Sequence, residues 1–222
     1  MTWGALLTDQ YGNPWVTPET TPMSLVNKIV INANTPGVYI LPVNASSPFV
    51  VACHSTVDGA IFWISKANDT YGLNYSKAAS SDSVGTVTIY IFGIVIPQSL
   101  PKFGIAIWNA AGQCILTNET KVMPAPQSFG TIGNANDTGY FINKTVSGKF
   151  AVIPKIMGQI NGTVNAGGQI RPVSSAIDTG AYYNGSSTRL YSGLRRNVVT
   201  GAETVTYANS RDLIYAIDVS YL

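Results

Sequence analysis

Along most of this chain, apolar residues are grouped in short runs that are typical of β-strands. Residues 25–32 are rich in β-branched residues, with Leu25, Asn27, Ile29 and Ile31 on one face of a strand and Val26, Lys28 and Val30 on the other. Similar runs occupy residues 38–43, 49–53, 60–65, 86–95 and 213–217. Gly, Pro, Asn and Ser separate them, and no segment shows a long apolar stripe of helical period, so the pattern predicts an all-β fold of the sandwich or barrel type.

One segment of the chain occurs twice. Residues 3–23 align without a gap with residues 103–123, at a constant offset of 100. The identical pairs are Gly4/Gly104, Gly12/Gly112, Thr17/Thr117, Glu19/Glu119, Thr20/Thr120 and Met23/Met123. A repeat of this length indicates a duplicated structural unit.

Each copy of this segment predicts a β-hairpin. Asp9 and Asn109 begin a four-residue turn that ends at Gly12 and Gly112, which is the residue pattern of a type I turn followed by a glycine of positive φ. The shared glycine near the start of the first strand, Gly104 in the second copy, predicts a bulge or a close approach of the backbone.

Weaker similarity continues beyond the hairpins. Residues 139–142 resemble residues 38–41, and residues 149–153 resemble residues 48–52, now at an offset of 101. The copies then diverge over residues 156–211. We therefore predict two tandem, related antiparallel β-sandwich-like domains, residues 1–97 and 102–222, each opening with a hairpin, with the proline-containing residues 97–102 as a short stiff linker.

The composition fits a folded protein with few surface charges. Hydrophobic residues make up 45% of the chain and charged residues only 11%, so the polar surface consists mainly of Ser, Thr, Asn and Gly. A surface with so few charges suits a protein that is surrounded by neighbours in an assembly, and we expect a homo-oligomer.

Charge and hydropathy exclude several functional classes. The formal net charge is +2, and no basic cluster is larger than Arg195-Arg196, so nucleic-acid binding is not expected. No apolar run reaches the length of a membrane span, so membrane insertion is not expected either. The first ten residues lack the features of a secretory signal, which predicts a protein that is made and assembled in the cytoplasm.

Histidine and cysteine are neighbours at Cys53 and His54. Adjacent side chains in a regular strand point to opposite faces, so we expect no catalytic dyad here. We expect His54 to lie near solvent at a strand end, because Ser55 and Thr56 follow it. Cys53 and Cys114 are predicted to be buried free thiols; a disulfide between the two copies is the alternative.

Other chemistry is weakly represented. The 11 acidic residues are dispersed, and the sequence has no Cys-x-x-Cys motif, no histidine pair and no Asp-rich calcium loop. Gly167-Gly168 lacks the lysine and the Ser or Thr of a phosphate-binding loop. We therefore predict no catalytic residue, no metal and no cofactor, with a pair of carboxylates assembled by the fold for glycoside cleavage as the remaining alternative.

The strongest candidate for recognition lies in the part of the second copy that has no counterpart in the first. Tyrosine and arginine supply much of the binding energy at protein interfaces, and both also stack on sugars. The candidate contact surface consists of Tyr182, Tyr183, Asn184, Arg189, Tyr191, Arg195 and Arg196. The alternative is that they are ordinary strand and turn residues. The four tryptophans, Trp3, Trp15, Trp63 and Trp108, are expected to pack in the core or against a sheet.

The hairpins resemble a family of small all-β virion proteins that are associated with the tails of tailed bacteriophages. The resemblance rests on an aromatic residue followed by Gly, then an aliphatic residue, Asn or Asp, Gly and Glu. The matching residues are Phe103, Gly104, Ile107, Asn109, Gly112 and Glu119, with Trp3, Gly4, Leu7, Asp9, Gly12 and Glu19 in the first copy. The family has no known catalytic residues to transfer.

The resemblance implies a non-enzymatic structural protein of a phage virion, at the tail tip or a tail-fibre attachment. Its partners would be other phage tail proteins, with the first domain docking and the second making specific contacts. The alternative is a receptor-binding or carbohydrate-binding module of the tail that uses the tyrosine-rich insertion to contact a host receptor or glycan. A small glycan hydrolase is a third, less favoured interpretation.

Overall fold

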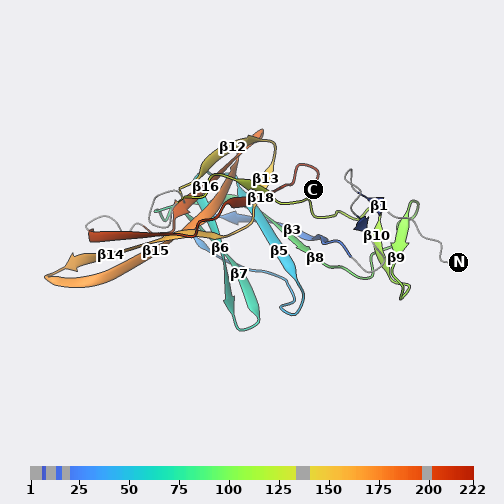
Figure 1. The fold of residues 1–222 in the computed structure, drawn as a ribbon, viewed down its shortest axis with the longest axis horizontal. Helices are drawn as coiled ribbons and strands as arrows, with labels where there is room; N and C mark the ends of the chain where they lie inside the picture. The colour runs from blue at the N-terminus through green and yellow to red at the C-terminus, as the bar shows by residue number, and fades with distance from the viewer. Residues whose placement is uncertain (1–6, 9–13, 17–20, 134–140, 197–201) are drawn as a thin grey trace. The chain divides into compact units, whose positions relative to one another are not determined.

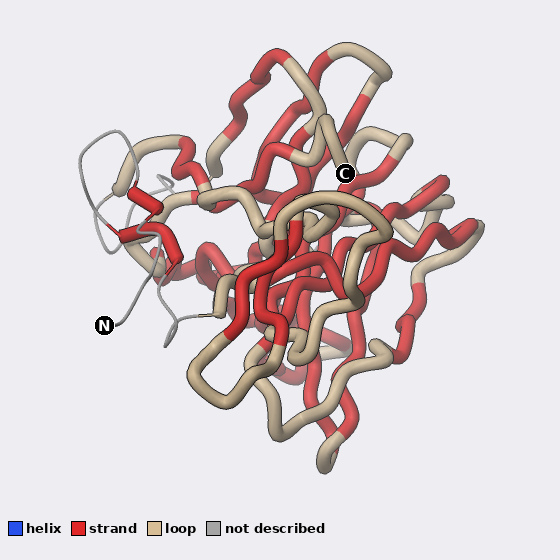
Figure 2. Tube along the Cα trace, turned by 90° about the vertical axis from the view of Figure 1, so that its right-hand side faces the viewer, coloured by secondary structure: helices blue, strands red, loops and turns tan. Residues whose placement is uncertain are grey.

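All regular structure in the described part of this chain is β-structure. The computed structural model describes residues 7–8, 14–16, 21–133, 141–196 and 202–222. Every element in these ranges is a β-strand, and Figure 2 shows strands joined by loops with no helix among them. The prediction of an all-β fold is therefore confirmed.

Two hairpins form separate small sheets, and the remaining strands belong to one 14-stranded sheet (Figure 1). The hairpin strands are β1 (Leu7–Thr8) with β2 (Pro14–Val16), and β9 (Ala106–Trp108) with β10 (Cys114–Thr117). The large sheet contains β3 (Ser24–Ala33), β4 (Gly37–Ile40), β5 (Phe49–Ser55), β6 (Ala60–Ala67), β7 (Thr70–Lys77), β8 (Gly85–Gly93), β11 (Gln127–Phe129), β12 (Asn143–Ser147), β13 (Phe150–Val152), β14 (Ile156–Ala166), β15 (Gln169–Tyr183), β16 (Ser187–Leu194), β17 (Ala202–Asn209) and β18 (Ile214–Asp218).

The chain folds into two compact units, each assembled from separate stretches of sequence. The first comprises Met1–Asn27, Ser46–Val50 and Ile91–Met123, and the second comprises Lys28–Ala45, Val51–Tyr90 and Pro124–Leu222. Strands from both predicted domains pair within the second unit, where β6 lies beside β15 and β5 beside β13. The structure therefore does not confirm two tandem sandwiches divided at residues 97–102.

Both predicted hairpins form antiparallel strand pairs. In the second copy, the N–H of Gly112 donates to the carbonyl oxygen of Asn109 at 3.0 Å, and Gly112 has a φ of +74°. The Asn109 Oδ1 also accepts from the N–H groups of Ala111 and Gln113, which closes the turn as an Asx turn does. In the first copy β1 pairs with β2; its turn, with Asp9 and Gly12, lies outside the described residues.

The structure confirms a close backbone approach at Gly104. This residue has a φ of +135°, and a Cβ atom there would collide with the side chain of Asn118. The Asn118 Oδ1 instead accepts a hydrogen bond from the N–H of Ile105 at 3.1 Å. Only glycine combines this backbone angle with room for the amide. The equivalent Gly4 lies outside the described residues.

The two copies of the repeat meet at equivalent positions. The N–H of Met123 donates to the carbonyl oxygen of Met23 at 2.8 Å, and the N–H of Leu25 donates to the carbonyl oxygen of Lys121 at 2.8 Å. Between them, Ser24 and Val122 form an antiparallel bridge. The ends of the two copies therefore pair with each other as short antiparallel segments, with Met23 and Met123 holding the same position of the repeat.

The core of the second unit is formed by strands that are buried on both faces. Val51, Ala52, Cys53, His54 and Ser55 of β5 are successive residues, and all are buried. The continuous apolar run of β8 is buried in the same way. Strands of this kind do not alternate between apolar and polar residues, because neither face meets water.

The insertion at residues 156–211 consists mainly of four strands. β14 pairs with β15 on one side and with β17 on the other, which makes a three-stranded ribbon. Figure 1 shows β14 and β15 running outward beyond β6 and β16. The described residues 167–172 at the tip of the β14–β15 hairpin are exposed, and Ile170 among them is 65% exposed. The divergent part of the second copy is thus a projecting β-structure.

The long strand β15 changes partners along its length. Its first part pairs with β14, its second part pairs with β16, and Thr179 and Tyr182 pair with β6 and β5. Gly180 lies where these partners converge. A Cβ atom there would collide with the carbonyl oxygen of Ala60 and would lie 2.6 Å from Cε2 of Tyr191. The convergence of strands therefore requires a residue without a side chain at this position.

The substitution Gly180→Ala tests this requirement. We expect it to lower the free energy of unfolding by about 1–3 kcal/mol, as overpacking of a well-packed core does. The measurement is urea-induced unfolding followed by circular dichroism. Gly167→Ala is the control, because nothing lies within 4 Å of a Cβ there and only its φ of +65° opposes the substitution. Equal effects of the two substitutions would contradict the packing argument.

Candidate binding groove

The second unit contains a groove with a volume of about 620 Å³. It is bordered on one side by β4, β6 and β7, and on the other by β14, β15 and the residues that follow β16. The side chains on which its chemistry depends are Trp63, Asn74, Ser76, Ser175, Arg195 and Arg196. These come from widely separated stretches, so the groove exists only in the folded chain.

Strand register places the first wall of the groove. Trp63 of β6 lies opposite Asn74 of β7, which in turn lies opposite Val38 of β4. Residues that are directly paired across strands point to the same face, so the three side chains form a row. The Nδ2 of Asn74 donates to the Ser65 Oγ at 2.8 Å, which fixes the amide beside the indole.

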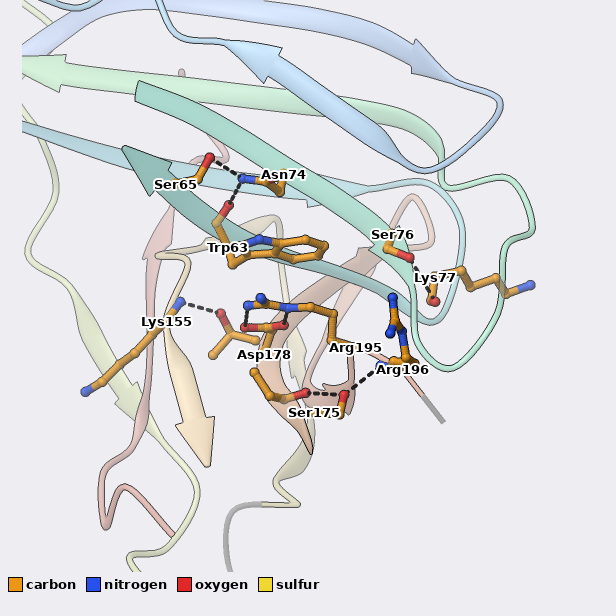
Figure 3. Close-up of polar contacts among 12 residues, drawn as sticks. Trp63, Ser65, Asn74, Ser76, Lys77, Lys155, Ser175, Asp178, Arg195 and Arg196 are labelled. Carbon is orange, nitrogen blue, oxygen red and sulfur yellow. Dashed lines mark hydrogen bonds and ion pairs between the residues drawn. The ribbon is translucent and has the colours of Figure 1, made fainter. Parts of the chain in front are cut away.

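A stacked arginine supports the tryptophan. The Cζ of Arg195 lies 3.9 Å from the ring centroid of Trp63, as expected for a cation–π contact. The same guanidinium donates from Nε and Nη2 to the two carboxylate oxygens of Asp178, at 2.7 and 2.8 Å. Figure 3 shows Arg195 between Trp63 and Asp178. One face of the indole is thus held by the protein, and the remainder of this partly exposed ring lines the groove.

Asp178 has a positioning role. It is wholly buried, and burial raises the pKa of its carboxyl group, while its bond and charge interaction with Arg195 act in the opposite direction. Both of its oxygens accept from the guanidinium, so the carboxylate holds Arg195 in a fixed orientation. Removing either partner would leave the other without its counter-charge beneath the groove.

Arg196 differs from Arg195 in its environment. Its backbone N–H donates to the Ser175 Oγ at 2.8 Å, which ties it to β15, while its side chain is exposed and lines the groove. A second cavity of about 430 Å³ is also lined by Arg195 and Arg196, together with the serine-rich residues after β7. The two arginines therefore border both cavities.

The structure divides the predicted contact surface into separate groups. Arg195 and Arg196 lie at the groove. The other five residues lie further along β15 and β16, around the turn that joins them. Tyr182 is six residues beyond Ala176 on the same extended strand, a separation of about 20 Å. The seven residues thus do not form one surface with the groove.

Two of these residues have structural contacts. Tyr191 is only 3% exposed, and its hydroxyl donates to the carbonyl oxygen of Ala60 at 2.6 Å, so this side chain belongs to the core. Arg189, opposite Tyr182 in the register, forms an ion pair with Asp58 at 2.5 Å and stacks on Tyr191. Its guanidinium is largely engaged within the chain.

The turn residues also have local roles. The Asn184 Oδ1 accepts hydrogen bonds from the N–H groups of Ser186 and Ser187, at 3.0 and 2.9 Å, and so closes the β15–β16 turn. The Tyr183 hydroxyl donates to the carbonyl oxygen of Gly185 at 2.5 Å. Both side chains act as turn residues, which was the alternative interpretation of this sequence.

His54 is buried, and the prediction that it lies near solvent is wrong. It is 3% exposed because β5 is covered on both faces, and neither ring nitrogen has a hydrogen-bond partner among the described residues. Burial, with the charges of Lys149 and Lys28, lowers the pKa of His54 from 6.5 to about 4. Burial also raises the pKa of the Cys53 thiol, so neither group has the properties of a catalytic partner at neutral pH.

The prediction of two buried free thiols is confirmed for Cys53 and Cys114. Of the carboxylates noted in the sequence, Asp178 pairs with Arg195 and Asp212 pairs with Lys155. Within the described ranges, no three His, Cys, Asp or Glu side chains form a group suited to holding a metal ion.

Trp63, which was expected to pack in the core or against a sheet, lies on β6 half-buried against Arg195 and also lines the groove. The strand β7 was not predicted, and without β7 the row of side chains beside Trp63 cannot be recognised. A signal was present: Asn68-Asp69 is a two-residue turn between Ala67 and Thr70, and Asn68 has a φ of +53°. Trp108 is also not a core residue, being 49% exposed, and the side chains of Trp3 and Trp15 lie outside the described part.

Comparisons of the chain with protein-family models, curated proteins and solved structures found no match. Among the described residues, no helix has the length and apolar composition that a membrane crossing requires.

His54 predicts a specific dependence of stability on pH. The unfolded chain takes up a proton near pH 6.5, whereas folded His54 does so only near pH 4. The stabilisation is therefore complete above pH 6.5 and is lost as the pH falls toward 4, by about 3 kcal/mol. Urea unfolding between pH 7 and pH 4 measures it.

The control is His54→Phe, which keeps an aromatic ring and removes the titrating group. The carboxylates titrate in both proteins, so the relevant quantity is the difference between their pH profiles. We expect a shallower decline for the variant between pH 6.5 and 4. Parallel profiles would show that His54 is protonated equally in the folded and unfolded chains.

Proposed function

We propose that this chain is a non-enzymatic carbohydrate-binding protein of a bacteriophage tail, and that it binds sugar in the groove beside Trp63. The observation that carries the proposal is the combination of a partly exposed, immobilised indole with the amide of Asn74 and the hydroxyl of Ser76 in one groove. The resemblance of the two hairpins to tail-associated virion proteins supports the placement in a phage tail.

The chemistry of the groove suits a sugar. A sugar ring presents C–H groups on its faces and hydroxyl groups around its rim. An indole offers a flat apolar surface to the C–H groups, and amide and hydroxyl side chains donate to and accept from the hydroxyls. Binding sites generally combine apolar surface with a few well-placed polar groups, which is the composition seen here.

The arrangement favours binding over hydrolysis. Glycoside cleavage requires two carboxyl groups placed across the scissile bond. Among the described residues that line the groove there is no carboxylate, and the nearby Asp178 has both oxygens engaged by Arg195. A role as general acid or nucleophile would require Asp178 to give up these bonds.

The substitution Trp63→Ala tests the proposal. It removes the apolar surface of the groove, and we expect glycan affinity to fall by at least about tenfold, as for a central aromatic at a binding site. The measurement is isothermal titration against the glycans that the unaltered protein retains on a glycan array. If the unaltered protein retains no glycan, the proposed function is wrong.

Two variants serve as controls. Trp108→Ala removes an exposed tryptophan from the first unit, and we expect no change in affinity. The double substitution Tyr182→Ala and Tyr183→Ala removes the tyrosines of the contact surface predicted from sequence while sparing the groove. Loss of binding in that double variant, with Trp63→Ala unaffected, would move the site to the β15–β16 turn.

A structural role in the virion is the second candidate function, and the projecting ribbon favours it. The outer strand β17 pairs only with β14 among the described strands, so it lies at an edge of the sheet that these strands form. A ribbon of this kind is marginal in stability unless something covers it. Neighbouring copies of this chain in a homo-oligomer, docked among other tail proteins, would supply the cover.

Exposed Ile170 near the ribbon tip provides the test. We expect the unaltered protein to form a defined oligomer, and Ile170→Lys to weaken it, because a charge then lies in an apolar contact. Light scattering coupled to size-exclusion chromatography measures the mass. Val30→Lys is the control, since Val30 is similarly exposed but lies in β3. A monomer at all concentrations would exclude homo-oligomer formation through the ribbon.

A further inference from the structure

Arg196 gives the groove a net positive charge. The charge of Arg195 is balanced by Asp178, which is buried directly beneath it. Among the described residues, no acidic group pairs with Arg196, and none lines either cavity beside it. The groove therefore presents one uncompensated guanidinium to whatever it binds.

Arg196 is also held in place. Its N–H is fixed by the Ser175 Oγ, and it directly follows Arg195, whose side chain is fixed on both sides by Asp178 and Trp63. A guanidinium on an anchored backbone loses less conformational freedom on binding than one on a free loop. Its planar fork suits an anionic group that offers two oxygens.

We propose that the ligand of this groove is an acidic oligosaccharide, with one sugar beside Trp63 and its carboxylate or sulfate on Arg196. This inference rests on the proposed carbohydrate-binding function and specifies its ligand class. The second cavity, of about 430 Å³, begins at the same two arginines and continues along Ala79, Ser80 and Ser81. It provides space for the next sugar of the chain, so the anionic group would lie near the junction of two sugars.

The local electrostatics support an anion over a cation. No acidic side chain lines either cavity in the described part of the chain. The two carboxylates close to the lining are each paired with a cation, Asp178 with Arg195 and Asp82, which follows Ser81, with Lys77. A neutral sugar would leave Arg196 in water at little cost, whereas a cationic sugar would meet repulsion. The preference for acidic over neutral sugars should therefore depend on Arg196. Binding of the sugar ring itself should depend on Trp63.

A glycan array that presents acidic and neutral forms of the same backbones tests the inference. The matched pairs are sialylated and desialylated chains, uronates and their methyl esters, and sulfated and desulfated chains. We expect the protein to bind the acidic member of at least one pair about tenfold more tightly. Comparison of the pairs that differ in a carboxylate with those that differ in a sulfate shows which of the two anionic groups the protein binds.

Four variants separate the possible results. Arg196→Gln should abolish the preference for the acidic member while keeping binding of the neutral one, and Arg196→Lys should retain only part of the preference. Arg171→Gln is the matched control, because Arg171 is an exposed arginine of β15 that does not line either cavity. Trp63→Ala should weaken binding of both members of each pair.

The outcomes are distinguishable. Equal binding of acidic and neutral members would overturn the inference and leave the carbohydrate-binding function standing. A preference that survives Arg196→Gln would also overturn it, because the anionic group would then lie elsewhere. Failure to bind any glycan would overturn the proposed function itself.

Discussion

The fold of the second unit depends on β15, which pairs with several other strands along its length. Along its 15 residues it pairs with β14, β16, β6 and β5. The strands can converge only because Gly180 leaves room for the Ala60 carbonyl and the ring of Tyr191. Nearer its start, at residues 174–176, the same strand lines the groove. β15 thus connects the ribbon, the groove and the core of the second unit.

Charge pairing then determines which of the two arginines at the groove has a buried partner. Burying Asp178 without a partner would be costly, since a carboxylate loses its hydration in the interior. Arg195 supplies the counter-charge, and its second face supports Trp63. The next residue, Arg196, has the same side chain but no buried partner in the described structure. Two adjacent arginines therefore have different environments: Arg195 is paired with Asp178 and stacked on the aromatic ring, whereas the side chain of Arg196 is exposed.

Turns and other local backbone features could be predicted from the sequence better than contacts between distant parts of the chain. The turn at Asn109 and Gly112 and the close approach at Gly104 follow from residue chemistry within a few positions, and both are present. The burial of His54 could not be predicted in this way, because the strands that cover β5 come from distant parts of the chain. The position of Trp63 in the groove could not be predicted for the same reason, since its neighbours there include residues more than 100 positions away. Arg195 and Arg196 could be selected as candidate contact residues from their residue type. Which of the two is held by an ion pair and which is exposed depends on the position of Asp178, which only the fold reveals.

The pairing of Met23 with Met123 has a consequence for how the first unit is held together. The hydrogen bonds between residues 23–25 and 121–123 join the ends of the two copies, which lie about 100 positions apart in the sequence. Bringing such distant segments together costs conformational entropy, because a long loop of chain must close. Each copy of the repeated segment thus supplies one of the two strands of this contact, and the first unit can form only when both ends of the intervening chain are in place.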